Sequence, residues 1–117
     1  MIFPSLSDCV CLDAARFGGK SAHLAGLAKR GFPIPAGFAI PIDAVLAWQS
    51  PLLPQIEAEI ATLDDLGEQR VADRITALFL SNPLDDGLRN RIAASCRAHL
   101  PVGITSRVAV RSSAVGE

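Results

Sequence analysis

Apolar residues recur every three or four positions through the middle of the chain, which is the spacing of one face of an α-helix. Three stripes carry this pattern: Leu53, Ile56, Ile60 and Leu63; Val71, Ile75, Leu78 and Phe79; Leu88, Ile92, Cys96 and Leu100. They predict helices that bury these faces in a core. A break is expected at 81–83, and Pro101 ends the last helix.

Glycine and proline divide the first half of the chain into shorter elements. Gly18 and Gly19 precede a helix and Gly31 ends it, whereas the prolines within 32–37 exclude a helix there. The expected elements are an irregular lead-in over 1–17 in which 10–12 can form a short strand, a helix over 20–30, a short buried strand over 37–40 and a helix from about 43 to 48.

The last segment has β-type character. Val108, Ala109 and Val110 form an apolar run that continues into polar residues. Taken with the helices, this run predicts an α+β fold that is mostly helical with a few strands. A lone strand leaves its backbone N–H and C=O groups unpaired. We therefore expect further chain after residue 117, or a partner, to pair with it.

Composition narrows the class of protein. The chain has 117 residues, half of them hydrophobic, and a formal net charge of −1, which suits one domain with a core of its own. Near-neutral charge argues against a nucleic-acid binder, which normally carries a basic patch. No apolar stretch approaches the roughly 20 residues of a membrane helix, and the N-terminus lacks the basic start of a signal peptide. We expect no membrane association and a cytoplasmic location.

The cysteines predict no special chemistry. Cys9, Cys11 and Cys96 lack the paired spacing of a zinc site, and an odd number is a poor disulfide framework. We expect reduced, partly buried thiols and no metal site in this chain.

Candidate chemistry begins with Gly18, Gly19 and Lys20 at the start of a predicted helix. Two glycines let the backbone approach a ligand closely, and a helix N-terminus offers N–H donors and partial positive charge to an anion. The alternative is a glycine-rich turn with an exposed lysine, which a short motif alone does not exclude. A Walker A loop is excluded, because it needs glycine where Ala14 stands.

A second candidate is Arg111, which follows the apolar run and precedes Ser112 and Ser113. Arginine presents a rigid fork of donors that matches phosphate or carboxylate oxygens, and the serines add hydroxyl donors. The alternative is an ordinary strand end with a solvated arginine.

In combination, the motifs resemble a known family. Three runs carry the resemblance, in order: GGKSAHL at 18–24, GFPIPAGF at 31–38 and VAVRSSA at 108–114. They are similar to segments of the phosphoenolpyruvate synthase and pyruvate phosphate dikinase group, to which rifampicin phosphotransferase is related. The helical middle matches only in pattern. Residues 1–117 thus resemble the N-terminal portion of an ATP-grasp nucleotide-binding domain, whose C-terminal part is expected after residue 117.

The resemblance implies a kinase-type phosphotransferase that passes a phosphoryl group from ATP through a histidine carrier to pyruvate or a related acceptor. In that family the matching lysine and arginine contact the nucleotide phosphates, and here they are Lys20 and Arg111. The implied nucleotide-binding set also includes Gly18, Gly19, Ser112 and Ser113. No catalytic residue of this chain is implied.

The resemblance also implies ATP and Mg²⁺ as cofactors, with the metal ligands outside this chain. The implied partners are the remainder of the ATP-grasp domain and a phosphohistidine domain, in the same or another chain. Neither histidine fits the carrier: His23 stands at a variable position of the motif, and His99 is expected at the surface, at a helix end.

A second class of function stays open at this point, namely a non-catalytic or split-protein ATP-grasp fragment that acts as a binding or interaction module. In either case the chain supplies at most one wall of a nucleotide site. We therefore expect the chain alone to lack phosphotransferase activity and to bind ATP weakly or not at all.

Overall fold

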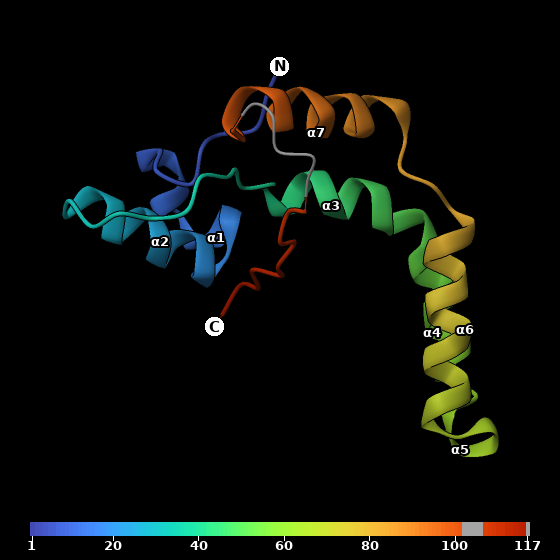
Figure 1. Ribbon diagram of the computed structural model, residues 1–117. Helices are drawn as coiled ribbons and strands as arrows, with labels where there is room; N and C mark the ends of the chain where they lie inside the picture. The colour runs from blue at the N-terminus through green and yellow to red at the C-terminus, as the bar shows by residue number, and fades with distance from the viewer. Residues whose placement is uncertain (102–106, 117) are drawn as a thin grey trace. The chain divides into compact units, whose positions relative to one another are not determined.

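Nearly all of the regular secondary structure is helical (Figure 1). The computed structural model describes residues 1–101 and 107–116. The elements are η1 (Cys9–Leu12), α1 (Ala14–Phe17), α2 (Gly19–Lys29), α3 (Ile42–Gln49), η2 (Ser50–Leu52), α4 (Leu53–Ile60), α5 (Leu63–Leu66), α6 (Glu68–Ser81) and α7 (Asp86–His99). The predicted helices are confirmed to within a few residues, and the mostly helical character with them.

The chain divides into two compact units. Unit 1 contains Met1–Val45 and the chain from Asp86 onward, and unit 2 is Leu46–Asp85. The boundary after Val45 falls inside α3. Both sequence motifs lie in unit 1.

The predicted strand at 10–12 is wrong, because this stretch belongs to a short 3₁₀ helix. Asp8 caps η1 by accepting a hydrogen bond from the Val10 N–H at 3.0 Å. Asp13 caps α1 in the same way, accepting from the Ala15 N–H at 3.1 Å. Aspartate satisfies helix N–H groups that have no partner within the helix, so two successive caps favour turns over extended chain.

Neither of the other two predicted strands, at 37–40 and 108–110, forms as a strand, and only the first makes a β-bridge. In the described parts of the chain, strand pairing is confined to an isolated antiparallel bridge between Ser5 and Phe38, so the 37–40 segment is extended without forming a ladder. The 107–116 stretch contains no strand either, and Val110 is 91% exposed. A β-type sequence forms a strand only where another strand pairs with its backbone. The ATP-grasp lobe itself stays a prediction.

A buried cluster holds the first part of unit 1 together. Phe17 of α1 and Ala25 of α2 pack with Cys11 and Ala39, and Leu6 lies against them. Burial, with a smaller contribution from the Asp8 carboxylate, raises the pKa of the Cys11 thiol. Of the three cysteines, Cys11 is buried, Cys96 is half-buried and Cys9 is exposed.

Helix α7 is attached to the N-terminal segment through Phe3, which is completely buried. The Phe3 N–H donates to Ser95 Oγ at 2.7 Å, and the Arg91 guanidinium lies 4.1 Å from the centre of the Phe3 ring. His99 Nε2 lies 2.7 Å from the Phe3 carbonyl oxygen, and its ring packs near Phe38. His99 is the last residue of α7, as expected, but it is half-buried, not fully at the surface.

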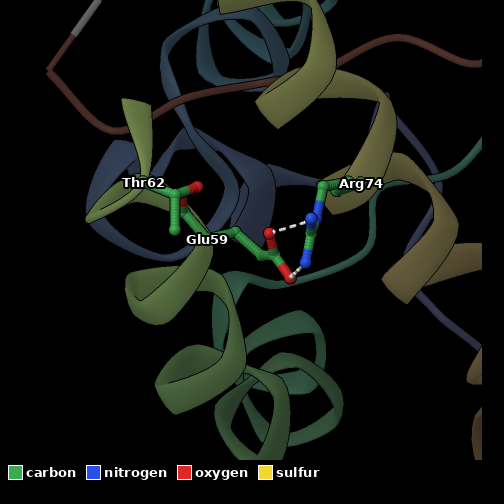
Figure 2. A network of polar contacts seen from close by, with 3 residues as sticks. All are labelled: Glu59, Thr62 and Arg74. Carbon is green, nitrogen blue, oxygen red and sulfur yellow. Dashed lines mark hydrogen bonds and ion pairs between the residues drawn. The ribbon is translucent and has the colours of Figure 1, made fainter. Parts of the chain in front are cut away.

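Unit 2 is a helical hairpin in which α4 and α6 pack against each other. Figure 2 shows the polar contact that joins them: Arg74 Nε lies 2.6 Å from Glu59 Oε2. Thr62 Oγ1 also donates to the Glu59 carbonyl oxygen at 2.7 Å (Figure 2). Because the Arg74 side chain is 56% exposed, solvent screening limits this pair to about 1 kcal/mol. Leu52 and Val71 are the buried hydrophobic residues among those described in unit 2.

Candidate functional site

The two motifs from opposite ends of the sequence meet at the N-terminus of α2. The Gly19 N–H donates to the Ala114 carbonyl oxygen at 3.0 Å, and the Ser21 N–H donates to Ser113 Oγ at 3.1 Å. The first N–H groups of a helix have no partner within it. Here two of them are satisfied by the segment that follows Arg111.

Gly18 is required at this junction for two separate reasons. Its φ of 84° and ψ of 166° lie in a region that essentially only glycine adopts. A Cβ atom at Gly18 would also overlap the carbonyl group and the hydroxyl of Ser113. At Gly18, the backbone therefore closely approaches the chain's own Ser113.

A wide-open pocket of about 540 Å³ lies beside this junction. Gly19, Lys20, His23 and Leu24 of α2 line it together with Pro35 and Arg111. The structure therefore brings two predicted cations, Lys20 and Arg111, to one pocket. A pocket with two cationic side chains is suited to an anion such as a phosphate chain.

Of the remaining predicted site residues, Gly19 also lines the pocket, whereas Gly18, Ser112 and Ser113 do not. Ser112 is exposed and Ser113 is half-buried, and neither lines the pocket. The backbone N–H of Gly19 and the hydroxyl of Ser113 have hydrogen-bond partners inside the chain. Nucleotide contact by Gly18, Gly19, Ser112 and Ser113 stays a prediction.

Three pocket residues, His23, Leu24 and Pro35, were not among the predicted site residues, and His23 is the polar one. It was set aside as a variable position, yet it lines the pocket and is exposed. The available signal was its spacing: residues three apart on a helix lie on the same face, so His23 follows Lys20 on the pocket side of α2. Leu24, four positions after Lys20, could have been found in the same way.

The described residues contain neither a metal-binding cluster nor a helix that could cross a membrane. Across residues 1–101 and 107–116, no group of three or more His, Cys, Asp or Glu side chains could hold a metal ion. None of the described residues that line the pocket is a carboxylate, so these side chains offer none of the oxygen ligands that Mg²⁺ prefers. No helix in these same stretches has the length and apolar character of a membrane crossing.

Comparison with known protein families gives a match over most of the chain. The sequence model of a family described as pyruvate phosphate dikinase, AMP/ATP-binding domain, matches residues 14–117. That range includes both motifs and all six pocket residues. No curated protein and no solved structure matches the chain.

Proposed function

The chain belongs to the pyruvate phosphate dikinase AMP/ATP-binding domain family, and we propose that it binds ATP through phosphate contacts with Lys20 and Arg111. Membership establishes an ATP-binding domain of this type. The residues that make the contacts, and the reaction they serve, are the proposal.

The observation that supports the proposal most is the shared pocket. Lys20 and Arg111 come from motifs at opposite ends of the sequence, and both side chains line the same cavity. Lysine interacts with phosphate oxygens as a compact point charge, whereas arginine offers two parallel N–H donors. Leu24 and Pro35 add an apolar wall against which the rest of the nucleotide can pack.

In this mode of binding, backbone N–H groups contribute less to phosphate recognition than they do in a phosphate-binding loop. The N–H groups of Gly19 and Ser21 are already hydrogen-bonded within the chain. Phosphate recognition therefore depends on the two side-chain cations. This differs from the helix N-terminus site expected from the glycines alone.

We further propose that the chain is the ATP-binding part of a phosphotransferase in which a phosphoryl group passes from ATP to a histidine carrier and then to pyruvate or a related acceptor. Catalysis of this kind rests on positioning and charge stabilisation, to which Lys20 and Arg111 are suited. Mg²⁺ would add charge neutralisation, and its ligands are expected outside this pocket. The carrier and the rest of the nucleotide site would be supplied by other segments, in the same or another chain.

Replacing Arg111 with lysine tests the proposal. The substitution keeps the charge but removes the planar fork. Loss of one net charge-assisted hydrogen bond, about 1.5 kcal/mol, corresponds to about a ten-fold weaker affinity for ATP. The affinity can be measured from amide chemical shifts of the isotope-labelled chain, which report binding in the millimolar range.

The matched control is Arg107→Lys, in the same segment, where Arg107 is exposed and does not line the pocket. Its affinity for ATP should equal that of the unsubstituted chain. If Arg111→Lys also binds ATP normally, Arg111 is a solvated surface residue and the phosphate role assigned to it is wrong.

A further inference from the structure

We propose that Ser113 is a positioning residue, which holds the Arg111 segment on the N-terminus of α2 and so keeps Lys20 and Arg111 at one pocket. The inference rests on the proposed ATP site. It assigns to Ser113 a role through its neighbours, in place of the nucleotide contact that the family resemblance implies.

The contact that carries this inference is the hydrogen bond from the Ser21 N–H to Ser113 Oγ, at 3.1 Å. Ser21 is 8% exposed and Ser113 is half-buried, so the bond is partly shielded from water. The second bond, from the Gly19 N–H to the Ala114 carbonyl oxygen at 3.0 Å, flanks it. We call this pair of bonds the Ser113 latch.

Gly18 makes the latch specific. Because it has no Cβ, the Ser113 carbonyl and hydroxyl can lie directly against its backbone. Any side chain there would push Ser113 away from α2. Gly18 and Ser113 therefore pack directly against each other, and this contact fixes where the Arg111 segment lies along α2.

The positions of the cations in the two motifs connect the latch to the pocket. Lys20 directly precedes Ser21, and Arg111 stands two residues before Ser113. Fixing Ser21 against Ser113 thus limits the relative movement of the two cations. Outside the latch, Arg107–Ser112 are exposed and form no helix or strand. Without the latch, ordering Arg111 would consume part of the binding free energy.

Three variants of the complete chain test the inference: Ser113→Ala, Ser113→Thr and Ser81→Ala. Ser81 is the matched control, because its hydroxyl also bonds a backbone group, the Ala77 carbonyl, but in unit 2. Two quantities are measured for each: hydrogen exchange at the Ser21 amide and affinity for ATP. The Ala22 amide, which bonds Gly18 within the helix start, serves as an internal reference.

Ser113→Ala is expected to raise exchange at Ser21 about five-fold relative to Ala22, the scale of one net hydrogen bond. Its affinity for ATP should fall by a similar factor. Ser113→Thr keeps the hydroxyl and should restore both, and Ser81→Ala should change neither. Restoration of ATP affinity by threonine separates positioning from a general loss of stability.

The outcomes distinguish this inference from the proposed function. If Ser113→Ala binds ATP normally while Lys20 and Arg111 variants do not, the ATP site stands and the positioning role is overturned. If Ser21 exchanges freely in the unsubstituted chain, the latch is absent from solution and the inference also fails. If the latch is protected but the unsubstituted chain does not bind ATP, the proposed function fails, and the positioning role with it.

Discussion

Alanine in place of Lys20 is expected to weaken ATP binding by about ten-fold or more. A charge-assisted hydrogen bond contributes about 1.5–3 kcal/mol, which sets this scale. Lys20 lies at the start of α2 and lines the pocket with Arg111, where a phosphate chain would be within reach of both cations. The affinity is measured by titration with ATP, monitored through the amide shifts of α2.

The control is Lys29→Ala at the other end of the same helix. Lys29 is exposed, stands in the last turn of α2 and is not part of the pocket. The Lys29→Ala substitution removes the same charge from the same helix as Lys20→Ala. A general electrostatic effect on the affinity for ATP would therefore appear in both variants. Equal affinities for ATP in Lys20→Ala and the unsubstituted chain would remove Lys20 from the site.

The second large effect is expected from Gly18→Ala, which should destabilise unit 1. An alanine would have to adopt a backbone conformation that costs about 1–3 kcal/mol. Its Cβ would also overlap Ser113, and overpacking of this kind costs typically about another 1–3 kcal/mol. If the Ser113 segment moves away from α2 to avoid this overlap, the hydrogen bond from the Ser21 N–H is lost. The Ser21 amide then loses its protection from hydrogen exchange.

Gly67→Ala provides a control with nearly identical backbone geometry. Gly67 precedes α6 with φ 85° and ψ 161°, against 84° and 166° at Gly18, but a Cβ there would meet no atom within 4 Å. It should therefore show the backbone cost alone. Free energies of opening from hydrogen exchange in each unit give the comparison. A Gly18→Ala cost equal to that of Gly67→Ala would contradict the close fit with Ser113.

Helices were predictable because their signals are local. The stripe from Val71 to Phe79 and the glycine that ends α2 need only neighbouring residues to act, and α2, α6 and α7 form where they were expected. The strands were not predictable to the same degree. Val108–Val110 has the composition of a strand, but a strand also needs a paired backbone, and none is supplied within the residues that the structure describes.

The cations of the candidate site could be predicted from the sequence, but the contact that brings their two segments together could not. Residue type and motif pointed to Lys20 and Arg111, and both line the pocket. The contact of Gly18 with Ser113 joins residues almost a whole chain apart, so no local pattern specifies it. The caps at Asp8 and Asp13 were readable from the sequence, because each aspartate directly precedes the first residue of a helix.

The most direct test of ATP binding between Lys20 and Arg111 is a titration of the isotope-labelled chain with ATP, followed at every assigned amide. We expect shifts to gather at residues 18–24 and 111–114, in two segments far apart in sequence, and to follow one dissociation constant in the millimolar range. The proposed site would be contradicted if ATP shifted amides elsewhere and left both segments unchanged. It would also be contradicted if millimolar ATP shifted no amide at all.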